Sequence, residues 1–192
     1  MSALLASDPP RMDVEEYLAW TKTRDGNFEL EDGFVLAMAP ERIVHSRAKG
    51  AAYRALSNAV AEAGAPCETF VEGPGVRIDR ATSYQPDVVV QCGERLSGDV
   101  RMIDHPVIVV EVLLPSTAYR DLGRKARNYF RVPSIAHYLI VDADDRVVTH
   151  KWRGEGGIVL SQDHADGDIV LQPPGIAVSV AGLLPPAEET PA

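Results

Sequence analysis

Two acidic residues stand where an unpaired charge would be unfavourable. Glu111 lies inside the most apolar segment of the chain, VIVVEVLL over residues 107–114, and Asp87 begins a second apolar run directly after Pro86. Desolvating an isolated carboxylate costs several kcal/mol, so we expect a compensating partner. Carboxylates at the ends of neighbouring strands can converge on one hard divalent cation, and Mg²⁺ is typically held by one or two carboxylates with water and substrate phosphate. The two residues therefore indicate a Mg²⁺ site, which Mn²⁺ could also occupy.

A basic residue follows on the next predicted helix. Asp121 and Lys125 are four residues apart and share one helix face, from which Lys125 can lean back toward the two carboxylates. Two other interpretations stay open at this point. The same spacing is common for an exposed Asp–Lys pair, and Glu111 could lie near the end of its strand, exposed or paired with an arginine.

Other catalytic motifs are missing from the chain. It has no GxGxxG loop, no Walker lysine loop, no GxSxG and no HExxH. The histidines also lack the close spacing of metal ligands, and they are His45, His105, His137, His150 and His164. The candidate chemistry therefore centres on the two carboxylates.

The elements that must position these residues indicate an α+β fold with a mixed β-sheet flanked by helices and extended by β-hairpins. The near-continuous apolar run at 107–114 is typical of a strand covered on both faces, so it belongs in the centre of the sheet. Helical periodicity and capping signals predict helices over 13–22, 41–63 and 119–131, the last capped by Ser116-Thr117. Alternation and turn signals predict strands at 68–72, 75–79, 86–91, 157–161 and 168–171, with hairpins at 28–38 and 138–152.

Composition fits one compact domain. The 192 residues are 45% hydrophobic and 24% charged, which predicts an N-terminal arm (1–11), a single domain (12–184) and a disordered proline-rich tail (185–192). No apolar run approaches the length of a membrane span. The spacing of Cys67 and Cys92 indicates neither a disulfide framework nor a zinc knuckle. We therefore expect a cytoplasmic protein in a reducing compartment.

Positive charge is concentrated on two of the predicted helices. The chain carries a net charge of −9, so its whole surface cannot bind a polyanion and any nucleic-acid site must be local. Five basic residues against one acidic residue give +4 over 119–131, and four against two give +2 over 41–63. Such a strip favours phosphate binding, although solvent-facing arginines on any amphipathic helix would look similar.

Several linked motifs are similar to those of one family. They are Pro86-Asp87, the VEVLLPST segment at 110–117, Asp121 with Lys125 and Tyr129, YLIVD at 138–142, the ELEDG turn at 29–33, and His45. In order and spacing they resemble the Uma-two family of putative restriction endonucleases, a branch of the PD-(D/E)XK nuclease superfamily. The resemblance covers roughly residues 12–152.

The resemblance implies a restriction-endonuclease-like fold and a set of site residues. Asp87 and Glu111 would be metal ligands, and the backbone carbonyl of Val112 would be a further oxygen ligand. In the superfamily a lysine stands two residues after the acid, but this chain has Leu113 there. Lys125 is the natural substitute, because its position matches the family's own motif.

Two further residues could reach the same cleft. The resemblance places Glu29 there as an added acid and His45 as a phosphate or water contact. The alternatives are an ordinary hairpin carboxylate and an exposed helix histidine. Leu114 is a second departure, since the family usually has serine at that position.

The resemblance implies a Mg²⁺-dependent endonuclease that hydrolyses DNA and leaves a 5′-phosphate and a 3′-hydroxyl. A homodimer is also expected, and the apolar hairpin at 138–152 could supply its interface. A second hypothesis keeps the fold without catalysis, as a module that binds nucleic acid or protein, and the leucines at 113 and 114 and the acidity of the chain favour it. A third is hydrolysis of a small phosphate ester.

Overall fold

The computed structural model describes residues 11–38, 40–113 and 120–187, and it describes only the backbone of residues 120–122. Most of the expected N-terminal arm and the end of the expected tail lie outside these ranges, as does the predicted Ser116-Thr117 cap. Of the expected tail, Pro185 is described, and its carbonyl accepts a hydrogen bond from Arg146 Nη1 at 3.1 Å.

The described elements follow the α+β pattern expected from the sequence. The helical elements are α1 (Val14–Thr21), α2 (Ile43–Glu62), the π-helical turn η1 (Arg120–Lys125), α3 (Ala126–Tyr129), the 3₁₀ turn η2 (Glu155–Gly157) and α4 (Val180–Leu183). The first strands are β1 (Phe28–Glu31), β2 (Phe34–Ala37), β3 (Cys67–Val71), β4 (Gly75–Asp79), β5 (Thr82–Tyr84), β6 (Val88–Cys92) and β7 (Met102–Ile103). The later strands are β8 (Pro106–Val112), β9 (His137–Asp142), β10 (Val147–Arg153), β11 (Val159–His164), β12 (Asp168–Leu171) and β13 (Ile176–Ser179).

A six-stranded mixed sheet forms the centre of the molecule, in the order β11-β10-β9-β8-β6-β3. Strand β8 lies between β6, with which it is antiparallel, and β9, with which it is parallel. This interior position explains its near-continuous apolar sequence, because both of its faces are covered. The sequence prediction of a central strand is confirmed.

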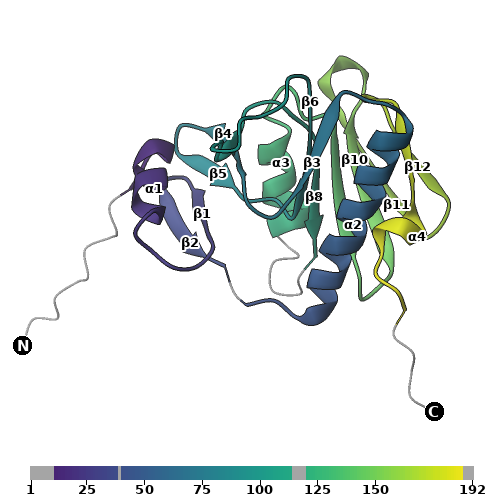
Figure 1. The fold of residues 1–192 in the computed structure, drawn as a ribbon, viewed down its shortest axis with the longest axis horizontal. Helices are drawn as coiled ribbons and strands as arrows, with labels where there is room; N and C mark the ends of the chain where they lie inside the picture. The colour runs from purple at the N-terminus through teal and green to yellow at the C-terminus, as the bar shows by residue number, and fades with distance from the viewer. Residues whose placement is uncertain (1–10, 39, 114–119, 188–192) are drawn as a thin grey trace, which may run out of the picture.

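The two faces of this sheet are covered by different helices (Figure 1). Val110 and Val112 pack in one core cluster with α2, whereas Val109 packs in a second cluster with Tyr129 of α3. Since successive side chains of a strand alternate between faces, Glu111 lies on the same face as Val109. The carboxylate therefore faces the α3 side of the sheet.

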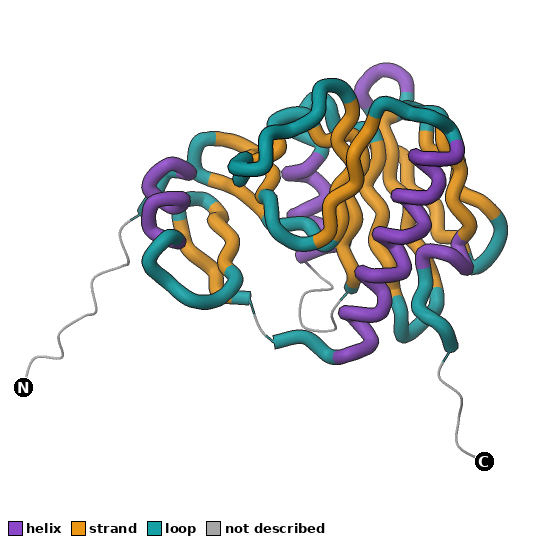
Figure 2. The backbone as a smooth tube through the Cα atoms, viewed as in Figure 1, coloured by secondary structure: helices purple, strands orange, loops and turns teal. Residues whose placement is uncertain are grey.

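A second sheet of five strands, in the order β2-β1-β5-β4-β7, lies beside the first and toward the N-terminal end of the fold. Its β1–β2 hairpin turns at Asp32-Gly33 as predicted, with Gly33 at φ 85°. Helix α1 begins with the predicted capping box, in which Asp13 and Glu16 each accept a hydrogen bond from the other's backbone N–H. Figure 2 shows how these short strands approach the larger sheet.

Several short elements were not predicted from the sequence. Strands β5, β7 and β13 and helix α4 have four residues or fewer, and a hydrophobic period is hard to recognise over so few residues. The helix expected over 119–131 begins in the structure with the π-helical turn η1 rather than a regular α-helical turn. Such turns are often found at functional sites.

The hairpin that the sequence offered as a dimer interface is partly buried within the monomer. Tyr138 and Val148 are fully buried, and β11 pairs along the outer side of β10. The apolar character of this hairpin is therefore explained by the core of the monomer.

The two cysteines also differ from expectation. Cys67 of β3 is paired directly with Cys92 of β6, their Cα atoms lie 3.9 Å apart, and their sulfur atoms form a disulfide. Sequence spacing alone did not indicate this bond, because it depends on the register of two strands that are separated by a turn and two further strands. Among the described helices, none combines the length and the hydrophobicity that a membrane span requires.

Two buried histidines lie side by side on neighbouring strands. His137 Nδ1 of β9 and His150 Nε2 of β10 are 3.0 Å apart and share a hydrogen bond. Burial lowers the pKa of His150 to about 3, and the neighbouring His137 and His164 contribute in the same direction. Burial also lowers the pKa of His137. Both rings are therefore held neutral in the folded protein at neutral pH.

We expect the folded state to lose stability in acid because of this pair. Between pH 6.5, the ordinary pKa, and about 3, the unfolded chain binds a proton at residue 150 that the folded chain does not, so stability increases with pH. The free energy of unfolding should fall by roughly 1 kcal/mol for each pH unit below 6.5. Urea titrations across this range should show a shallower pH slope for His150→Gln. The exposed His105→Gln should keep the wild-type slope, and an unchanged slope for His150→Gln would contradict the expectation.

Candidate active site

A cluster of buried charged side chains lies where β8 ends and β6 begins. Each of its members is at most 6% exposed, and they come from both sheets and both flanking helices. They are Glu29 of β1, Lys49 of α2, Asp87 before β6, Glu111 of β8 and Lys125 of η1. Charged groups are rarely buried unless they are paired, and here carboxylates and ammonium groups are interleaved.

Asp87 and Glu111 lie across from each other on neighbouring strands. The register pairs Val88 with Val110, so one further step along it brings Asp87 opposite Glu111. Opposed residues of an antiparallel pair have Cβ atoms about 4.5–5.5 Å apart on one face. Asp87 Oδ2 also accepts a hydrogen bond of 2.6 Å from the backbone N–H of Val112. The structure thus brings the two predicted metal ligands together.

Lys125 joins two of the carboxylates. Its Nζ lies 3.0 Å from Glu111 Oε1 and 2.9 Å from Glu29 Oε1. The hydroxyl of Tyr129 donates a 2.7 Å hydrogen bond to the same Glu111 oxygen. Burial, with the nearby Glu111, raises the pKa of Tyr129 well above its ordinary value, so this hydroxyl stays a donor. Lys125, singled out from the sequence, is therefore in contact with both Glu111 and Glu29.

Lys49 is a member of the cluster that the sequence analysis missed. Its Nζ lies 2.8 Å from Asp87 Oδ1 and 3.0 Å from Glu72 Oε1, and it also bonds to Glu41. Burial alone would lower the pKa of Lys49, but the surrounding carboxylates, Asp87 first among them, raise it above its ordinary value. The lysine therefore stays charged and neutralises Asp87.

A usable signal for Lys49 was present in the sequence. It stands four residues after His45 on the helix face that otherwise carries Ala52 and Leu56, all of which are buried. A lysine that interrupts such an apolar face is unusual, whereas the charge count places Lys49 only among the basic residues of a strip that favours phosphate binding. The informative property of Lys49 was its position on the apolar face of the helix, rather than its charge.

Tyr84 supports the cluster from the smaller sheet. Its hydroxyl donates a 2.7 Å hydrogen bond to Glu31 Oε1 and accepts one of the same length from Asn128 Nδ2. Lys125 Nζ lies 5.3 Å from the centroid of the tyrosine ring, within the range of a cation–π contact. Strand β5 thereby helps to fix the lysine against Glu111.

His45 lies at the edge of this arrangement. It is 1% exposed, and its Nε2 is 2.9 Å from the carbonyl oxygen of Leu113, just beyond the end of β8. The described hydrogen bond therefore goes to the backbone rather than to a carboxylate of the cluster. A role for His45 as a phosphate or water contact stays a prediction, as does the carbonyl of Val112 as a metal ligand.

Much of the positive charge predicted to face phosphates is already paired with carboxylates. This is true of Lys49 and Lys125, as described above, and of three arginines. The arginine pairs are Arg42–Asp144, Arg124–Glu31 and Arg131–Asp79, at 2.6, 3.2 and 2.9 Å. The side chains of Arg120 and Asp121 lie outside the described part of the molecule. The strip is thus less basic than the sequence count indicates.

The donor set suits a hard cation. Asp87 and Glu111 offer only carboxylate oxygens, the ligand type that Mg²⁺ and Mn²⁺ prefer. Within the described ranges, no three His, Cys, Asp or Glu side chains are already arranged to hold a metal ion. A site of this kind would therefore depend on two carboxylates with water and substrate oxygens, which is a common way of holding Mg²⁺.

Comparison with known proteins identifies the family and the fold of the chain. The model of the Uma2 (Uma-two) family, described as "Putative restriction endonuclease", matches residues 14–184. An uncharacterised Synechocystis protein, slr1290, is 33% identical over 135 residues, which cover 70% of each chain. The crystal structure of a putative nuclease belonging to DUF820 from Anabaena variabilis has a TM-score of 0.70 and 13% identity, covering 91% of this chain and 97% of that one.

Proposed function

The chain belongs to the Uma2 family of putative restriction endonucleases, and from this we propose that it is a Mg²⁺-dependent endodeoxyribonuclease. The observation that carries the proposal is the contact of Lys125 Nζ with Glu111 and Glu29. Glu111 lies on β8, and the backbone N–H of Val112 on the same strand donates a hydrogen bond to Asp87. Two opposed carboxylates with a buried ammonium group beside them supply the parts that phosphodiester hydrolysis needs. The nuclease fold of the Anabaena structure supports the same conclusion.

Asp87, Glu111 and the carbonyl of Val112 would hold the Mg²⁺ ion, and Mn²⁺ could replace it. When bound, the ion supplies a Lewis acid that lowers the pKa of water and stabilises charge on the phosphate. The ammonium groups of Lys49 and Lys125 now neutralise these carboxylates. Both lysines would also add positive charge beside the negatively charged substrate.

The other residues of the cluster orient the reacting groups. Lys125 would donate a hydrogen bond to the attacking water or to the phosphate and neutralise the charge that builds during attack. Tyr129 fixes the Glu111 carboxylate through its hydroxyl, and Lys49 fixes Asp87. The water oxygen forms the new bond to phosphorus, and the bond from phosphorus to the 3′ oxygen breaks. A 3′-hydroxyl and a 5′-phosphate result.

One observation favours the second candidate function, a nuclease-fold module that binds nucleic acid or protein without cleaving. Leu113, which stands where the superfamily has its lysine, packs against the core cluster on the α3 face. Calorimetric titration with Mn²⁺ separates the two candidates. A binding module would show no metal binding that depends on Asp87 and Glu111.

The proposed function predicts metal-dependent cleavage of DNA. Purified protein should convert supercoiled plasmid to nicked and linear forms in Mg²⁺ or Mn²⁺ and should leave it intact in EDTA, because the carboxylate pair is otherwise neutralised by lysines. End-labelling should find 5′-phosphates on the products. Cleavage that persists in EDTA, or that survives Asp87→Ala, would exclude this site as its source.

Two further expectations stay predictions. A homodimer would allow both strands of a duplex to be cut, and sedimentation of the purified protein would test it. The cytoplasmic location is likewise untested.

A small phosphate ester as substrate would show as turnover of a model phosphodiester without any retention of the protein on DNA.

A further inference from the structure

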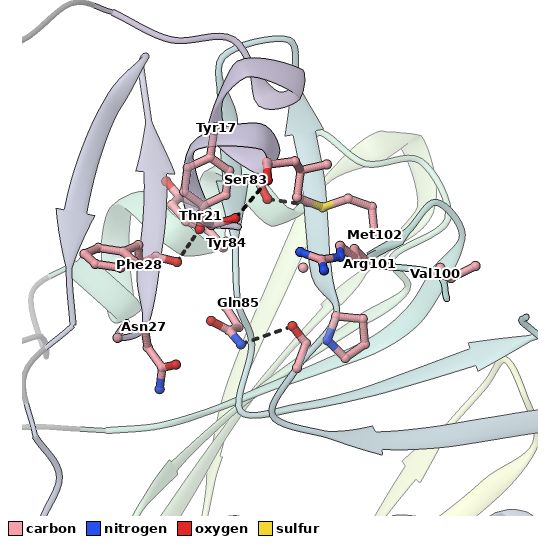
Figure 3. A pocket seen from close by; sticks show the side chains of 15 residues that line it. Tyr17, Thr21, Asn27, Phe28, Ser83, Tyr84, Gln85, Val100, Arg101 and Met102 are labelled. Carbon is pink, nitrogen blue, oxygen red and sulfur yellow. Dashed lines mark hydrogen bonds between the residues drawn. The ribbon is translucent and has the colours of Figure 1, made fainter. Parts of the chain in front are cut away.

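A pocket lies between α1, the start of β1 and the segment before β4 (Figure 3). Its volume is about 400 Å³, within the range of small-molecule sites. Its polar and aromatic side chains come from segments far apart in the sequence. They are Tyr17, Thr21, Asn27, Phe28, Ser83, Tyr84, Gln85 and Arg101.

The lining has the chemistry of a site for a planar, polar aromatic group. Tyr17 and Phe28 supply ring surfaces, and the amides of Asn27 and Gln85 can both donate and accept hydrogen bonds. None of the lining residues is an aspartate or a glutamate, and Arg101 adds one positive charge. The chain has a net charge of −9, so a surface without carboxylates repels a phosphate less than the rest of the molecule does. The pocket therefore favours a ligand attached to phosphate.

Arg101 is available to such a ligand. Within the described chain its guanidinium has no carboxylate partner, and the residue is exposed. In Figure 3 the side chains of Arg101 and Phe28 are drawn on opposite sides of the pocket. Both residues line the pocket, and aromatic rings and guanidinium groups both stack on bases.

The pocket shares its wall with the candidate active site. Tyr84 lines it and also contacts Lys125 through its ring and Glu31 through its hydroxyl. Gln85 lines it, and its backbone N–H lies 3.4 Å from Glu29 Oε1. Asp87 follows two residues later. A nucleotide whose phosphate lay at the carboxylates would therefore have its base or its neighbour's base close to this pocket.

We propose that the pocket binds an unstacked nucleobase of the DNA substrate beside the phosphate that is cleaved, an inference that rests on the proposed nuclease function. A base inside a duplex is stacked and paired, so it enters a pocket only when it is flipped out, which costs unpairing and unstacking energy that a single-stranded base does not require. The favoured substrate class is therefore DNA with single-stranded, looped or frayed nucleotides. Aromatic surfaces accept any base, so little sequence preference is expected from the pocket.

Trp20 offers a direct readout of occupancy. Its ring lies 4.9 Å from that of Phe28, edge to face, and Phe28 lines the pocket. The chain has two tryptophans, so Trp152→Phe leaves Trp20 as the single reporter. In EDTA, a short single-stranded oligodeoxynucleotide should quench or shift its fluorescence saturably, and the matched duplex should bind more weakly.

Two variants of the pocket and one control test the site. Asn27→Asp places a negative charge in the pocket lining at an exposed position, and Arg101→Ala removes the cation of the lining. Each should weaken single-strand binding by at least about fivefold. Arg95→Ala removes an arginine of similar exposure that pairs with Glu68 outside the pocket, and it should bind as the wild type does. Unchanged thermal unfolding of the variants excludes misfolding.

Equal affinity for single strand and duplex, or unchanged binding by both pocket variants, would overturn the inference. Because binding is read in EDTA, it does not depend on cleavage. A protein that binds single strands through the pocket but never cuts DNA would contradict the proposed nuclease function alone. A protein that cuts DNA with pocket variants as active and as unselective as the wild type would contradict the pocket alone.

Discussion

Replacing Glu111 with glutamine is expected to lower the rate of metal-dependent DNA cleavage by at least about 10²-fold. The substitution keeps the size and shape of the side chain but removes the charge that would hold the metal ion. The amide oxygen can still accept the hydrogen bond from Tyr129, and Lys125 keeps its 2.9 Å contact with Glu29. The initial rate of plasmid nicking in Mn²⁺ and the calorimetric affinity for Mn²⁺ would both be measured.

Glu62→Gln is the matched control for this experiment. Glu62 is the last residue of α2 and is exposed, so the same chemical change there should leave cleavage and metal affinity as they are in the wild type. If Glu111→Gln nicks plasmid at the wild-type rate, Glu111 does not belong to the proposed site. A loss of cleavage together with unchanged Mn²⁺ affinity would leave Glu111 a role in the reaction but not as a metal ligand.

Replacing Lys49 with methionine should lower the free energy of unfolding by about 3 kcal/mol. The lysine is 5% exposed and lies 2.8 Å from Asp87, which is itself 6% exposed. Removing one partner of a buried ion pair leaves the other charge desolvated and unpaired, and that penalty exceeds the net value of the pair. Methionine preserves most of the side-chain volume, so the change in urea midpoint reports mainly the lost charge.

Two further variants assign the cause of this loss. Arg42→Met removes a cation near the start of the same helix, but its partner Asp144 is half exposed, so the loss should stay below about 1 kcal/mol. Adding Asp87→Asn to Lys49→Met removes the unpaired charge and should restore part of the stability. A double variant as unstable as the sum of the two single variants would show that the pairing is not the cause.

The sequence was informative where an element is long and its pattern is uniform. Helix α2, strand β8 and the β1–β2 hairpin are confirmed, because an apolar period of adequate length or a strong turn signal determines each of them. The short strands β5 and β7 left no such pattern, although β5 carries Tyr84. The π-helical turn was also missed, because its residues follow a spacing that equally predicts a regular α-helix.

The site was predicted in part, for a similar reason. Asp87 and Glu111 drew notice because a charge in an apolar strand needs a partner, and the structure places Lys125 in contact with both Glu111 and Glu29. Lys49 escaped notice because charged residues on helices usually face water. The disulfide was missed because only the register of β3 and β6 brings the two cysteines together.

Helix α2 both packs the hydrophobic core and presents residues of the candidate active site, two tasks that many enzymes keep on separate elements. The face that packs Ala52 and Leu56 into the larger core cluster is the face that presents His45 and Lys49 near the end of β8. A small slide or rotation of this helix would therefore misalign the carboxylates and loosen the hydrophobic interior at the same time. Variation along this face is constrained twice, so a substitution there that changes the rate of cleavage should also change thermal tolerance.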